Sequence, residues 1–127
     1  MPGAIRSFRD LIAWQKDMDL CEQVYALSKA FPPDERFGLT AQMRRAAVSI
    51  PSNIAEGYGR VRTQDYVRFL NLALGSLAEV ETQMLLSCRL GFRTADDIAP
   101  SRELVRELDR VLCALIRAVR ASASKEA

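Results

Sequence analysis

The sequence predicts an all-α fold, an antiparallel up-down-up-down four-helix bundle. Four segments repeat apolar residues at the three- and four-residue spacing of an amphipathic helix, and no strand-like alternation is visible. Proline or glycine stands at the end of each of the first three segments, where it can stop a helix. Because the connections between the segments are short, consecutive helices should run antiparallel. With 127 residues, we expect a single domain over 1–127 that buries a substantial core.

The first helix is expected over about residues 10–30. Pro32 and Pro33 should end it, because proline cannot continue a helix. Its apolar residues fall into two neighbouring strips. The first strip holds Leu11, Trp14, Met18, Cys21 and Tyr25, and the second holds Ala13, Leu20, Val24, Leu27 and Phe31. Two apolar strips on one helix predict more than one packing neighbour.

The second helix is expected over about residues 39–57, with a kink at Pro51. Its core face holds Leu39, Met43, Ala47, Ile50 and Ile54. Pro51 lacks a backbone donor and crowds the carbonyl of Ala47, so we expect a kink or a brief break at this point. The freed backbone groups could be hydrogen-bonded by the nearby side chains of Ser49, Ser52 and Asn53.

The third helix is expected over about residues 63–90, after Gly57 and Gly59 end the second one. Its core stripe holds Tyr66, Leu70, Ala73, Leu77, Val80, Met84 and Cys88. Three leucines stand on the opposite side, at Leu72, Leu86 and Leu90. The core of a monomeric bundle does not explain leucines on this side, so we expect them to form an oligomer interface.

A carboxylate, Glu81, projects from the middle of this core stripe. A charge inside an apolar stripe must be paired or neutralised, so we expect Glu81 to be buried against Arg44 or Arg45. It should belong to a structural polar network that comprises Arg45, Ser49, Asn53, Glu56 and Glu81.

The fourth helix is expected over about residues 101–121, and residues 122–127 should fray. Its core face holds Leu104, Leu108, Val111, Leu112, Leu115 and Val119. The opposite side carries an arginine stripe, formed by Arg102, Arg106, Arg110, Arg117 and Arg120.

The net charge is only +2, but the positive excess is local. Residues 36–68 contain six basic and two acidic side chains, and a clustered excess attracts an anionic partner more than the total charge does. We therefore expect nucleic-acid phosphates to contact Arg44, Arg60, Arg62 and Arg68 together with the stripe of Arg102, Arg106, Arg110, Arg117 and Arg120. The alternative for the stripe is a solvated face, on which Glu103, Glu107 and Asp109 neutralise the arginines.

The residue types present argue against an enzyme. The chain has no histidine, and its three cysteines are isolated and lack the spacing of metal ligands. Ser49 and Ser52 have no activating base in their segment. We therefore expect no catalytic residue, no metal and no cofactor. No apolar run approaches the ~20 residues of a membrane span, and the first residues carry no apolar signal core, so we expect a cytoplasmic protein without a membrane partner.

Residues 42–60, QMRRAAVSIPSNIAEGYGR, form the most distinctive stretch of the chain. This stretch resembles the signature of the bacterial 23S rRNA-intervening-sequence proteins. The resemblance continues in Leu11–Lys16, Phe31-Pro32, Gly38-Leu39-Thr40, Tyr66–Leu70, Gly75-Ser76-Leu77 and Glu79–Gln83.

The resemblance implies a four-helix bundle that assembles into a homopentameric ring. It also implies kinship with the accessory protein of diversity-generating retroelements, which works with a reverse transcriptase and nucleic acid. The first hypothesis is thus a non-enzymatic homo-oligomer that binds RNA or DNA through its arginines. The second is an oligomeric scaffold for a protein partner, by analogy a reverse transcriptase, with no nucleic-acid role.

Overall fold

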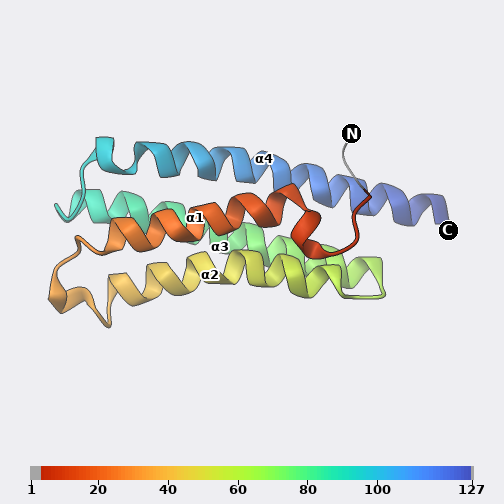
Figure 1. The fold of residues 1–127 in the computed structure, drawn as a ribbon, viewed down its shortest axis with the longest axis horizontal. Helices are drawn as coiled ribbons and strands as arrows, with labels where there is room; N and C mark the ends of the chain where they lie inside the picture. Colours follow the sequence, from red (N-terminus) through yellow and green to blue (C-terminus); the bar gives the residue numbers. More distant parts are fainter. Residues whose placement is uncertain (1–3, 127) are drawn as a thin grey trace.

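A computed structural model describes residues 4–126 of the chain. Within this range the fold is all-helical and contains no strand, which confirms the predicted fold class. The elements are η1 (Phe8–Asp10), α1 (Ile12–Ser28), η2 (Pro33–Glu35), α2 (Leu39–Tyr58), α3 (Thr63–Arg89) and α4 (Ala95–Glu126). Consecutive helices run in opposite directions along an elongated bundle (Figure 1). α1 packs against α2 and α4, and α3 packs against the same two helices, so the four helices surround one core.

The core face of α1 is the second of its two predicted strips. Leu20 and Val24 are fully buried, whereas Met18 and Tyr25 of the first strip are exposed. Of the first strip, Leu11 is buried in the core, and Trp14 and Cys21 are half-buried at the edge toward α2. For α2 and α3 the predicted core residues lie inside the bundle, with only Tyr66 and Cys88 half-buried.

α2 continues without interruption through Pro51, so the predicted break does not occur. Pro51 cannot donate to the carbonyl of Ala47, and that carbonyl accepts a hydrogen bond from the Cys21 thiol of α1 at 3.2 Å. Ser52 and Asn53 hydrogen-bond other carbonyls of their own helix, one turn back. The partner of the freed carbonyl therefore comes from a neighbouring helix, which sequence periodicity does not reveal.

Gly57 and Gly59 have different roles. α2 runs to Tyr58, so Gly57 lies inside the helix and does not stop it. A Cβ atom at Gly57 would lie only 2.8 Å from Cβ of Phe69 and 3.0 Å from the ring of Tyr66, both on α3. Gly59 caps the helix with helical backbone angles, and a Cβ atom there would make only an ordinary contact, 3.7 Å from the Glu56 carbonyl oxygen. The first glycine thus permits close packing of α2 on α3, and only the second marks the helix end.

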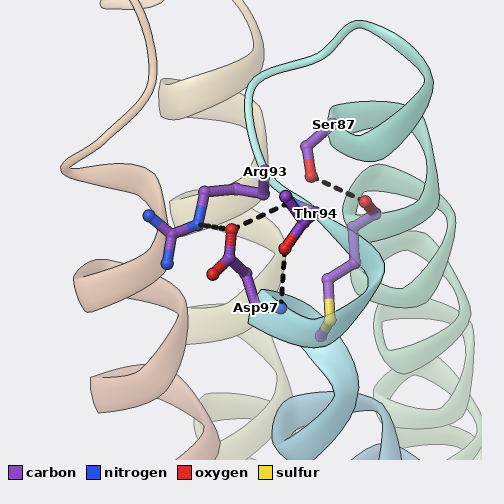
Figure 2. A network of polar contacts seen from close by, with 5 residues as sticks. Ser87, Arg93, Thr94 and Asp97 are labelled. Carbon is purple, nitrogen blue, oxygen red and sulfur yellow. Dashed lines mark hydrogen bonds and ion pairs between the residues drawn. The ribbon is translucent and has the colours of Figure 1, made fainter.

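α4 begins six residues before the predicted start, at Ala95. Figure 2 shows the reason, a reciprocal cap in which the backbone N–H of Thr94 donates to the Asp97 carboxylate at 2.8 Å and the Asp97 N–H donates to the Thr94 hydroxyl at 3.1 Å. These hydrogen bonds lower the pKa of Asp97, and Arg93 lies 3.6 Å from the same carboxylate. The helix also continues to Glu126, beyond the predicted end at residue 121.

The contrast between the two glycines gives a matched pair of variants. We expect Gly57→Ala to lower the free energy of unfolding by about 1–3 kcal/mol, because the added methyl forces α2 away from α3. Gly59→Ala should change it by less than about 1 kcal/mol and in the stabilising direction, since alanine loses less backbone entropy at a helical position. Urea denaturation of both variants at one protein concentration measures the difference. Equal destabilisation by the two would contradict the close contact.

Candidate nucleic-acid interface

Seven exposed arginines lie at the end of the bundle where α2 turns into α3. In Figure 1 this turn lies at the same end of the bundle as η1 and the last turns of α4. Arg120 lines one hollow with Thr63, Gln64 and Val67 at the start of α3. We call this surface the basic end, and it comprises Arg6, Arg9, Arg60, Arg62, Arg68, Arg117 and Arg120.

The basic end carries more positive charge than its carboxylates neutralise. Among the side chains that the structure describes, three acidic ones lie nearby, at Asp10, Glu56 and Asp65. The carboxylate of Asp10 accepts hydrogen bonds from the backbone at the start of η1. Glu56 pairs with Arg60 at 2.8 Å, and the pair is exposed, so it contributes little stability and a phosphate can compete for the arginine. Among the described residues, the other arginines of this surface form no ion pair.

Aromatic side chains support two of these arginines. The guanidinium carbons of Arg60 and Arg68 each lie 4.8 Å from the ring centroid of Phe69. Tyr58 and Tyr66 pack edge to face beside them, with their ring centroids 6.1 Å apart. Burial raises the pKa of Tyr66 to about 12. The contacts with Phe69 order the guanidinium groups of Arg60 and Arg68 before any ligand arrives, which reduces the entropy lost on binding.

The remaining arginines of the predicted α4 stripe lie away from the basic end. Arg102 lies 3.6 Å from Glu81 of α3, and Arg106 pairs with Glu103 at 3.0 Å. Close by, a hollow between α1 and α4 is lined by the carboxylates of Asp19, Glu22, Glu103 and Glu107. Arg110 is exposed in the middle of the helix. The stripe therefore divides, and Arg117 and Arg120 alone join the basic end.

Arg44 lies away from the basic end, between α1 and α2. Its guanidinium donates to the Ser28 hydroxyl at 2.8 Å and stacks over the Tyr25 ring at 4.6 Å. These contacts give Arg44 a structural role in joining the two helices. Of the nine arginines predicted to contact nucleic acid, five lie together, at Arg60, Arg62, Arg68, Arg117 and Arg120.

The predicted polar network is not one network. Glu81 is paired with Arg102 and not with Arg44 or Arg45, because Glu81 lies on the side of α3 that faces α4. Its side chain is 34% exposed, so it is not a buried charge either. The other members form separate local contacts: Ser49 hydrogen-bonds Ser76, Asn53 donates to the Ser49 carbonyl, Glu56 pairs with Arg60, and Arg45 is exposed beside Glu79 and Gln83.

The buried carboxylate of this protein is Asp17, which the sequence reasoning missed. Asp17 is fully buried on the core face of α1, and neither carboxylate oxygen has a hydrogen-bond partner. Burial raises its pKa to about 8, so the side chain is largely protonated at neutral pH. The signal was available in the sequence, because Asp17 stands four residues after Ala13 and three before Leu20, on the strip that forms the core.

The three predicted interface leucines are exposed on the outer side of α3. Leu72 is 48%, Leu86 42% and Leu90 52% exposed. A second apolar surface lies between α1 and α2, where a hollow of about 340 Å³ is lined by Trp14, Met18, Cys21, Val48, Pro51, Ser52 and Ala55. The bundle therefore presents two different apolar surfaces on its flanks.

In residues 4–126 no group of three or more His, Cys, Asp or Glu side chains is arranged to hold a metal ion. None of the helices in that range combines the length and the apolar character needed to cross a membrane.

Comparison with known proteins places this arrangement in a family. The family model of the 23S rRNA-intervening sequence protein matches residues 9–114. A 1.70 Å crystal structure of a protein of unknown function from the S23 ribosomal protein family of Bacteroides thetaiotaomicron has a similar fold, with a TM-score of 0.76. The two sequences are 23% identical, and the match covers 83% of this chain and 98% of that one. No curated protein matches the sequence.

The state of Asp17 predicts a pH dependence of stability. In the folded chain the Asp17 carboxyl stays protonated up to about pH 8, whereas in the unfolded chain it loses its proton near pH 3.8. The free energy of unfolding therefore falls as the pH rises through this window. The expected slope is up to about 1.4 kcal/mol per pH unit. Asp17→Asn should remove the slope and be the more stable protein at pH 8. Denaturation at several pH values tests this, with the exposed Asp19→Asn as control. Identical slopes for Asp17→Asn and the wild type would contradict it.

Proposed function

Because the chain belongs to the 23S rRNA-intervening sequence protein family, we propose that it is a non-enzymatic homo-oligomer that binds RNA or DNA phosphates at its basic end. The proposal depends on one observation, that the segments which meet at one end of the bundle carry seven exposed arginines and three carboxylates. Arginine suits this role because its planar guanidinium can donate two hydrogen bonds to one phosphate. Contacts of this kind carry no sequence information, so binding should be largely independent of sequence.

The two apolar surfaces support the proposed assembly. The leucines of α3 and the hollow between α1 and α2 lie on different elements and differ in composition. A contact that joins two different surfaces is head-to-tail, and such contacts close into rings when the rotation between neighbours permits it. By the family resemblance we take the ring to be a pentamer. Several basic ends in one assembly would add weak phosphate contacts into useful avidity.

A protein scaffold is the second candidate function, and one observation favours it. Arg102, Arg106 and Lys16 are engaged by carboxylates of the chain itself, so this flank of the bundle does not attract an anion. On this alternative the apolar flanks receive another protein and the arginines only keep the bundle soluble. The two candidates differ in whether a nucleic acid binds the purified protein.

We expect charge substitutions in either apolar surface to prevent ring closure, because a charge buried in an apolar contact is left unpaired. Leu86→Glu changes the α3 surface and Val48→Glu changes the α1–α2 hollow. Each variant alone should be monomeric, while their mixture should form a dimer through the one contact that stays intact. Light scattering coupled to size exclusion measures the masses. Phe37→Glu, at an exposed site outside both surfaces, is the control. A monomeric wild type at micromolar concentration would refute the assembly.

For binding, we expect the triple variant Arg62→Gln, Arg68→Gln and Arg120→Gln to weaken nucleic-acid affinity and to flatten its dependence on salt. The logarithmic salt slope should fall in magnitude by about 2 for a single strand if each arginine neutralises one phosphate. The matched control removes three arginines elsewhere, at Arg36, Arg89 and Arg106. Fluorescence anisotropy at several salt concentrations measures both variants. Equal losses in the two would assign the effect to net charge alone.

A further inference from the structure

We propose that the basic end selects unpaired nucleotides, in single-stranded RNA or DNA or in loops, over a duplex. This inference rests on the proposed function and goes beyond phosphate binding. Its structural basis is the turn between α2 and α3, which presents an apolar tip, Val61, between two arginines, and the ring of Phe69, over which Arg60 and Arg68 are stacked.

Packing within the bundle does not account for an apolar side chain at Val61. Its relative exposure is 101%, the highest of the large apolar side chains on the described surface, and its chain neighbours are Arg60 and Arg62. The turn itself is held at both ends. The N–H of Arg60 donates to the Gly57 carbonyl at 3.0 Å, and the Arg62 carbonyl accepts hydrogen bonds from the N–H groups of Asp65 and Tyr66. A turn that is hydrogen-bonded at both ends therefore exposes an aliphatic group to water between two arginines.

The arginines around Phe69 offer flat surfaces. Arg60 makes two contacts, the stacking over Phe69 at 4.8 Å and the exposed ion pair with Glu56 at 2.8 Å. Arg68 stacks on the same ring at the same distance. Unpaired bases stack on guanidinium planes and on aromatic rings, and every base has such a face, so this recognition tolerates any sequence.

Duplex nucleic acid cannot stack its bases on these groups. Its base faces are covered by neighbouring base pairs, so Val61 and the guanidinium groups of Arg60 and Arg68 can contact only phosphates and groove edges. A surface made of charge alone would bind a duplex at least as well as a single strand, because the duplex has the higher charge density. A preference for the single strand would therefore report the contribution of Val61 and of the stacked arginines.

The opposite end of the bundle supplies a matched control. Phe37 is 86% exposed there, and the guanidinium of Arg36 lies 5.2 Å from the centroid of its ring. Asp34 and Glu35 precede this pair in the chain, so the same combination of arginine and exposed apolar group lies in surroundings without a positive excess. Phe37 should therefore not contribute to binding.

The test compares one mixed-sequence RNA alone with the same RNA annealed to its complement, on the assembled wild-type protein. We expect the single strand to bind at least about fivefold more tightly, the lower bound for stacking of one base. Val61→Ser should reduce this preference and leave duplex affinity unchanged, Val61→Trp should increase it, and Phe37→Ser should do neither. Because Val61 is fully exposed, the variants should fold as the wild type does, and their oligomeric mass checks this.

Two negative results lead to different conclusions. Equal affinity for the single strand and the duplex, with no effect of either Val61 variant, would overturn the selectivity and leave phosphate binding intact. The absence of binding to both nucleic acids at low salt would overturn the proposed function together with this inference.

Discussion

The close approach of α2 and α3 at Gly57 is the constraint on which the basic end depends. With only 2.8 Å available to a Cβ atom, no larger residue fits against Phe69 without moving a helix. This contact brings the ends of α2 and α3 together, so that Tyr58 meets Tyr66 and Arg60 reaches the ring of Phe69. The turn that connects the two helices is short, residues 59–62, and it carries Arg62 at the same end. Gly57 thus links the packing of the core to the position of the charges.

The sequence predicted the core faces of α2 and α3 well, whereas on α4 only Leu108 and Leu112 of the six predicted core residues are buried. Val105 and Ile116, which were not predicted, are buried with them. α2 and α3 each have a single core stripe, and both stripes lie inside the bundle as expected. α1 has two strips of similar length, and periodicity alone could not tell which one faces the core. Because that choice was left open, Asp17 was not recognised as a core residue. At α4, the apolar pattern predicted a start near residue 101, but the cap formed by Thr94 and Asp97 begins the helix earlier, and Pro100 is tolerated near its beginning.

The candidate site could be predicted only in part, because charge clusters depend on which ends of the helices meet. Five of the nine predicted arginines lie together, whereas Arg44, Arg102 and Arg106 are engaged inside the bundle or beside carboxylates. Glu81 was assigned to the arginines nearest in the signature stretch, but it faces α4 and meets Arg102. A single sequence shows which side of a helix carries a charge. It does not show which neighbouring helix that side faces, and this decides the partner.

The positions of the apolar surfaces relative to the basic end bear on the proposed assembly. Both apolar surfaces lie on the flanks of the bundle, whereas the arginines lie at one end of it. In a ring closed through the flanks about an axis parallel to the helices, rotation alone relates the subunits, so every basic end lies on the same rim. Assembly then concentrates positive charge instead of burying it, and Val61 of each subunit stays exposed. A strand long enough to pass along the rim would contact several turns between α2 and α3, which makes oligomerisation and nucleic-acid affinity interdependent.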